Sequence, residues 1–108
     1  METARAKVFY DSVDDILYIK RDKSGESIKM SISIGDMVLD VSHNLKVLGI
    51  EVLNASKQYK LSKKILKEAK NADLRNIMKP NFFGAIYVIF LPKSTSIRER
   101  IAIPAEIS

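Results

Sequence analysis

The sequence contains no cysteine and only one histidine, His43. The absence of cysteine excludes disulfides, thiolate metal sites and cysteine nucleophiles, and it agrees with a reducing compartment. His43 stands beside Ser42 in a turn-like segment, without the activated serine and the orienting group that a Ser-His-Asp triad requires. A single histidine also leaves a zinc site short of its usual ligands. We therefore expect no catalytic residue and no cofactor, which favours a protein that is not an enzyme.

Glycine-rich signatures and long apolar runs are missing as well. The four glycines are scattered, so the phosphate-binding patterns built from clustered glycines are not present. The longest apolar run, Ala85 to Leu91, is far shorter than the roughly 18 residues of a membrane span. The first ten residues lack the apolar segment of a signal peptide. These absences predict a cytoplasmic protein that neither crosses nor binds a membrane.

The chain has 108 residues, of which 46% are hydrophobic, and this predicts a single domain, residues 1–108, with one modest core. The net charge of +5 is unevenly distributed. Residues 1–53 contain seven Lys/Arg and nine Asp/Glu, whereas residues 54–80 contain eight Lys/Arg and two Asp/Glu. The basic character of the protein is therefore predicted to belong to one segment of the chain.

Apolar residues alternate with polar ones from Val8 to Leu53, most clearly in the segment SIKMSISI. This period of two and the short connections predict an N-terminal antiparallel meander of about five strands. After Leu53 the period changes, and Ser62 is a candidate N-cap for one amphipathic helix ending near Lys70. About three strands follow, beginning with a short, charged edge strand in DLRNIMK. Strands, helix and strands in this order predict an α+β fold.

The segment Gly84 to Leu91 is apolar at nearly every position, so both faces of this strand require burial. One helix covers only one face of a small sheet. The other face must then meet a second sheet or a second subunit, and we expect a homodimer or a higher oligomer.

Two segments resemble the signatures of a prokaryotic family known as domain of unknown function 2283. The first is YDSVDDILYI, Tyr10 to Ile19, and the second is VLDVSHNLKVLGIEVLNAS, Val38 to Ser56. The resemblance covers roughly residues 8–57, with Ser12 in place of a frequent proline and SHNL in place of an Asp/Gly-containing turn. It implies a compact, β-rich cytoplasmic domain and assigns no activity.

Acidic residues in these two segments allow two interpretations. Carboxylates can bind a hard cation or divide acid and base roles, and the candidates for a metal site or a metal-dependent enzyme are Asp11, Asp14, Asp15, Asp40 and Glu51. The alternative is structural: Asp11 opens an Asx-type turn, and Asp14 or Asp15 accepts backbone amides. The segment DSVDD has neither the ligand number nor the glycine of a calcium loop, so we favour the turn.

Lysines on the predicted helix, joined by Lys57 and Lys60 if the helix begins near Ser56, give a candidate nucleic-acid surface. Ammonium groups along one face can contact phosphates without reading sequence, and the candidates are Lys57, Lys60, Lys63, Lys64, Lys67 and Lys70. An ordinary solvated helix face explains the same pattern, and we favour it because the helix has no arginine for base recognition.

Taken together, these features predict a small non-enzymatic interaction or assembly module that forms a homo-oligomer, with a dimer favoured. Sequence-nonspecific nucleic-acid binding through the lysines is the alternative function. A carboxylate-dependent metal enzyme is a weaker alternative.

Overall fold

The computed structural model describes residues 3–22 and 25–104. These residues form eight strands and two short helices. The strands are β1 (Thr3–Asp11), β2 (Ile16–Arg21), β3 (Ile28–Ile34), β4 (Met37–Ser42), β5 (Val47–Leu53), β6 (Asn71–Met78), β7 (Phe82–Phe90) and β8 (Ser96–Pro104). The helices are α1 (Ala55–Tyr59) and α2 (Lys63–Lys67).

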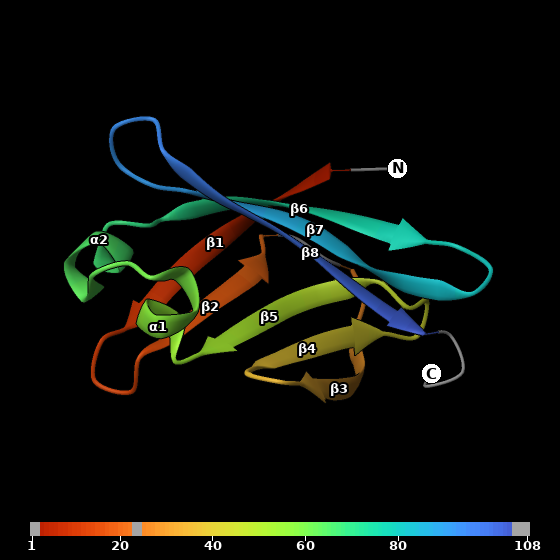
Figure 1. Ribbon diagram of the computed structural model, residues 1–108. Coiled ribbons are helices and arrows are strands. Elements are labelled where there is room, and N and C mark those ends of the chain that lie inside the picture. The colour runs from red at the N-terminus through yellow and green to blue at the C-terminus, as the bar shows by residue number, and fades with distance from the viewer. Residues whose placement is uncertain (1–2, 23–24, 105–108) are drawn as a thin grey trace.

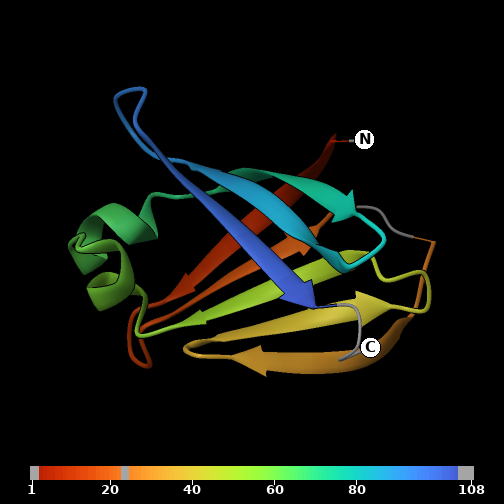
Figure 2. The ribbon, with the colours of Figure 1, turned by 45° about the vertical axis from the view of Figure 1, so that its right-hand side comes forward.

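All eight strands belong to one antiparallel sheet with the order β3-β4-β5-β2-β1-β6-β7-β8. The sheet curls into a half-barrel, so that β8 passes diagonally across the concave side of β5 in both views (Figures 1 and 2). The two helices lie together at the end of the half-barrel where the β1–β2 turn is located (Figure 2). The half-barrel leaves β3 and β8 as its two edge strands.

The predicted α+β class is wrong, because the protein is mostly sheet and its helices are five residues each. The N-terminal strands do not form a separate meander: β2 pairs with β1 and β5, while β3 lies at the edge. The pairing of β2 with β3 that the predicted meander requires is therefore absent from the described strands, and residues 23–24 between them lie outside the described residues. The segment DLRNIMK is not an edge strand either, since β6 lies between β1 and β7.

The predicted helix is interrupted. Lys60 adopts a left-handed conformation, with φ of 55°, and ends α1. Ser62 is the N-cap of α2, as predicted, and its side chain accepts a hydrogen bond from the Ile65 amide at 3.2 Å. Leu66 and Ala69 are buried, whereas Ile65 is 37% exposed. The helices cover the apolar interior at one end of the half-barrel rather than a whole sheet face.

The core lies inside the curl, between residues from both halves of the sheet. Leu17, Ile19, Leu39 and Ile50 come from one half, and the other half contributes Leu74, Phe83, Tyr87, Ile89, Ile101 and Ile103. The inner face of β7 is thus covered by the same sheet. A second subunit is therefore not needed to bury this face, and only the outer face of β7 is left to consider. Its outer face differs: Ile86 and Val88 are half-buried, and Phe90 is 46% exposed.

Within residues 3–22 and 25–104, no helix is long and apolar enough to span a bilayer.

Candidate functional site

The aspartates of the first signature lie in the turn between β1 and β2. The side chain of Asp11 accepts hydrogen bonds from the amides of Val13, at 2.9 Å, and Asp14, at 3.1 Å. A side-chain oxygen that accepts the amides two and three residues ahead is the geometry of an Asx turn. The predicted turn is therefore present, and Asp14 is exposed at its tip.

Asp15 connects this turn to the start of α1. Its backbone oxygen accepts the Ala55 amide at 3.0 Å, and its carboxylate accepts the Ser56 amide at 3.0 Å. The Ser56 hydroxyl donates to the same carboxylate at 2.6 Å. The local N-cap residue, Asn54, is left-handed and makes no side-chain cap bond. Asp15 thus satisfies the first amides of α1 from a distant part of the chain, as a capping residue does locally.

The Tyr10 hydroxyl also donates to Asp15, at 2.5 Å. We call Tyr10, Asp15, Ala55 and Ser56 the Asp15 cluster. Burial alone would raise the pKa of Asp15, but hydrogen bonds from Ser56 and Tyr10, together with the Lys63 charge, hold that pKa below its ordinary value. Burial and the neighbouring Asp15 carboxylate raise the pKa of Tyr10. Asp15 is therefore ionised and accepts hydrogen bonds from the uncharged donors of Tyr10 and Ser56. This arrangement stabilises the fold.

The cluster predicts acid sensitivity. Because the pKa of Asp15 is lower in the folded state than in the unfolded chain, its stabilisation is present above the unfolded value of about 3.9. That stabilisation is lost as pH falls through the lower, folded pKa. In thermal unfolding from pH 7 to pH 2.5, Asp15→Asn should melt below the wild type at pH 7 and approach it in acid. Asp14→Asn, in the exposed neighbour, should track the wild type; an Asp15→Asn deficit that persists unchanged to pH 2.5 would contradict this account.

Asp40 and Glu51 lie elsewhere, on the outward face of β4 and β5. They help to line a hollow of about 630 Å³, together with Tyr18, Lys20 and Gly49. Asp40 is opposite Gly49 and accepts a hydrogen bond from the Ser31 hydroxyl at 2.7 Å. The fold thus brings Asp40 and Glu51 to one hollow, while Asp11, Asp14 and Asp15 remain at the β1–β2 turn. In the part of the chain that the structure describes, no three His, Cys, Asp or Glu residues are placed to hold a metal ion.

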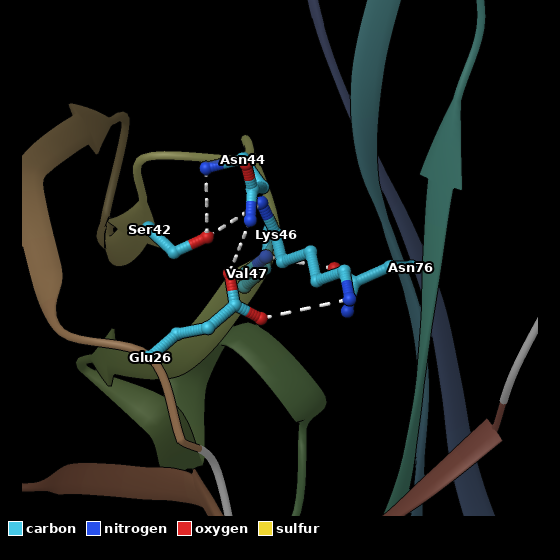
Figure 3. A network of polar contacts seen from close by, with 6 residues as sticks. All are labelled: Glu26, Ser42, Asn44, Lys46, Val47 and Asn76. Carbon is cyan, nitrogen blue, oxygen red and sulfur yellow. Dashed lines mark hydrogen bonds and ion pairs between the residues drawn. The ribbon is translucent and has the colours of Figure 1, made fainter.

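The turn containing His43 is held by its neighbours. His43 is exposed, while the adjacent Ser42 hydroxyl is buried and accepts the amides of Asn44 and Lys46 at 3.3 and 3.2 Å. Glu26 accepts from the Asn44 side chain at 3.1 Å and pairs with Lys46 at 3.5 Å, as Figure 3 shows. Ser42 is engaged in the turn instead of being presented as a nucleophile.

The same network joins the two halves of the sheet. Asn76 of β6 accepts the Val47 amide of β5 at 2.7 Å (Figure 3). Hydrogen bonds from Ser42 and Asn44, and the charge of Lys46, hold the pKa of Glu26 below its ordinary value. These contacts fix the end of the half-barrel opposite the helices.

Sequence reasoning missed a pair of tyrosines, in which Tyr87 belongs to the core and Tyr59 is half-buried against it. The hydroxyls of Tyr59, at the end of α1, and Tyr87, in the middle of β7, are 2.7 Å apart. Burial raises the pKa of both, that of Tyr87 to about 12. The negative charge of Glu99 also raises the pKa of both tyrosines. The two hydroxyls satisfy each other and fasten α1 onto β7. The continuous apolar run around Tyr87 indicated burial, but it did not indicate the partner.

The six candidate lysines are all exposed, yet they do not share one helix face. Lys57 belongs to α1, Lys63, Lys64 and Lys67 to α2, and Lys60 and Lys70 follow these helices. The ammonium group of Lys63 donates to the backbone oxygen of Ser12 at 3.1 Å, so it also supports the β1–β2 turn. The predicted single lysine stripe is replaced by two short groups.

Comparison with known proteins confirms the resemblance found in the sequence. Residues 7–56 match the family described as protein of unknown function (DUF2283). This segment covers β1 from Lys7, then β2–β5 and the start of α1, and it therefore contains the whole Asp15 cluster. A further match is an uncharacterised protein of Methanocaldococcus jannaschii, 33% identical over 82 residues.

That match covers 76% of this chain and 63% of the relative, so the chain spans less than two thirds of the relative's length. No solved structure matches the chain. In the matched family segment, the two signatures meet in space, because Tyr10 and Asp15 come from the first and Ser56 from the second. The contacts between the two signatures thus explain part of the fold and assign no function.

Proposed function

We propose that the protein is a non-enzymatic assembly module that forms a homodimer through its edge strand β3. The observation that carries this proposal is the exposed, nearly uncharged edge of the half-barrel. In the described residues, β3 pairs with β4 on one side only, and Lys29 is its one charged residue. Met30 and Ile32 are half-buried, and Ile34 is 39% exposed. Such an edge is a template for another strand.

The other edge strand is much less suited to self-pairing. At its centre, β8 carries Arg98, Glu99 and Arg100 in succession, all exposed. Charged residues on an edge strand are a common protection against edge-to-edge association. The contrast between the two edges supports β3 as the interface.

The sequence of β3 is self-complementary in an antiparallel arrangement. Its register with β4 is regular from Met30 to Ile34 and shifts before Met30. A two-fold axis at Ile32 places this residue opposite itself, with Met30 opposite Ile34 and Ser31 opposite Ser33 of the second copy. Apolar residues then meet on the inward face and serines on the outward face, without like charges across the axis.

Charge substitutions at the two serines test this arrangement. Ser31 and Ser33 are exposed, and the hydrogen bond from Ser31 to Asp40 that both variants lose is exposed too, so the fold should stay intact. Ser31→Lys/Ser33→Lys places like charges opposite each other at two points, and the variant should be monomeric at micromolar concentrations where the wild type is dimeric. Ser31→Lys/Ser33→Glu places opposite charges there and should remain a dimer. Sedimentation velocity measures both, with circular dichroism as the check on folding.

A monomeric wild type at micromolar concentration would refute the dimer. A wild-type dimer that both charge variants leave unchanged would place the interface away from β3.

A further inference from the structure

The outward face of β2, β1, β6, β7 and β8 gathers most of the arginines of the chain. Side chains of a strand point alternately to the two faces, and inward Ala6 and Val8 place their neighbours outward. Four of the five arginines lie on this face. With two lysines they form the basic outer face, defined as Arg5, Lys7, Lys20, Arg75, Arg98 and Arg100.

The strand register brings these charges together although they are far apart in sequence. One row across the sheet contains Arg5, Asp73, Val88 and Arg98. The next row contains Arg75, Ile86 and Arg100, and Lys7 is opposite Lys20. Rows two residues apart are separated by about 7 Å. The acidic residues pointing outward from these strands are Asp73 and, at the end of β1, Asp11, and Glu51 of the adjacent β5 lies opposite Tyr18. The six cations outnumber these three carboxylates, so the face is a cationic surface.

Aromatic rings lie among these cations. Phe9 is 66% exposed and Phe90 is 46% exposed. The ring of Tyr18 lies 6.0 Å from that of Phe9, at an angle of 35°. The guanidinium of Arg100 lies 5.7 Å from the centre of the Phe82 ring. Exposed aromatic rings and guanidinium planes are both groups on which unpaired bases stack.

The positive charge of this face disfavours a second copy of the chain as its partner. A second copy bound through the same face would set arginines against arginines, which costs free energy. A nucleic-acid duplex is also a poor fit, because its grooves admit a helix or a two-stranded ribbon rather than the broad side of a five-strand sheet. A single strand offers both phosphates for the cations and free base faces for the rings.

We propose that the basic outer face binds single-stranded nucleic acid without strong sequence preference. Arginines and lysines contact the phosphates, while Phe9, Tyr18 and Phe90 stack on bases. The site is on the sheet, and the lysines of α1 and α2 are not its main contacts. The proposal is independent of the β3 dimer, since β3 contributes no residue to this face.

The test is fluorescence polarisation of the full chain with a labelled 15-nucleotide single strand of mixed sequence, at several KCl concentrations. Arg75→Ala/Arg98→Ala, at two exposed positions, should weaken binding at least tenfold and reduce the salt dependence by about two phosphate contacts. Phe9→Ala should weaken binding about fivefold or more with an unchanged salt slope. The matched control, Lys64→Ala/Lys67→Ala, removes the same charge from α2 and should change affinity by less than threefold.

Several results would overturn the proposal. One is a failure of the single strand to bind at low salt. Another is a loss of affinity in the Lys64→Ala/Lys67→Ala variant as large as that in the Arg75→Ala/Arg98→Ala variant. Equal affinity for a hairpin duplex, or binding to phosphatidylserine vesicles in preference to the oligonucleotide, would also reject it. Thermal unfolding of each variant separates loss of binding from loss of fold.

Discussion

Gly84→Ala should lower the free energy of unfolding by about 3 kcal/mol or more. Gly84 is buried in β7 opposite Ala102 of β8. A Cβ at this position would overlap with the carbonyl oxygen of Ile101 and lie 2.8 Å from its carbonyl carbon. Both are backbone atoms of the neighbouring strand, so relief requires β8 to move away from β7. Urea unfolding at pH 7 measures the loss.

Two other glycines provide controls. A Cβ at Gly25 meets nothing within 4 Å, and one at Gly49 lies 3.4 Å from the nearest atoms, an ordinary contact. Gly25→Ala and Gly49→Ala should each change the free energy of unfolding by less than about 1 kcal/mol. If Gly84→Ala behaves like these two, the close approach of β7 and β8 is not a feature of the folded protein.

Asp15→Asn should lower the free energy of unfolding by about 2 kcal/mol at pH 7, because three donors lose an ionised acceptor. Asparagine tolerates the left-handed conformation of this position, where φ is 56°, so the substitution tests the carboxylate rather than the turn. Ser56→Ala removes the hydroxyl that donates to Asp15 and should cost about 1 kcal/mol. Chemical unfolding measures each value.

The double variant isolates the contact between the two residues. Since Ser56 and Asp15 bond directly, the two losses should not add, and the coupling should be about 1 kcal/mol. Ser12→Ala, in the same turn, keeps the backbone oxygen that Lys63 uses and should be nearly neutral. Strictly additive losses for Asp15→Asn and Ser56→Ala would show that the two signatures of the chain are not joined through this bond.

The strands themselves could be predicted from the sequence, but their order could not. Alternation in IKMSISI identifies β3 because it reports which face of a strand is buried. It carries no information about which strand lies next to it. Short connections correctly favour the pairing of sequence neighbours in most of the sheet, but not of β2 with β3. The pairings of β2 with β5 and of β1 with β6 are non-local, and alternation did not indicate them. The apolar face of the sheet is covered mainly by the sheet's own curl, and not by the single helix that was expected there.

Local polar chemistry was predictable, and distant polar contacts were not. The Asx turn at Asp11 and the N-cap at Ser62 depend on amides within three residues, so the residue type nearly determines the bond. The bond from Ser56 to Asp15 spans 41 residues and exists only because β2 and β5 are paired. Likewise, the arginines of the basic outer face are dispersed in sequence and are united by strand register.

The most direct test of the central claim, dimerisation through β3, uses the absence of cysteine from the chain. Ile32→Cys places one thiol at the proposed two-fold axis, where paired strands bring Cα atoms within about 5.5 Å, a distance that a disulfide spans. Ile97→Cys provides the matched control, since Ile97 is also half-buried and lies on the other edge strand, β8. Mild oxidation at micromolar protein concentration, followed by non-reducing electrophoresis, should yield a covalent dimer for Ile32→Cys and little for Ile97→Cys. Cross-linking of Ile32→Cys that is no faster than that of Ile97→Cys would contradict the account.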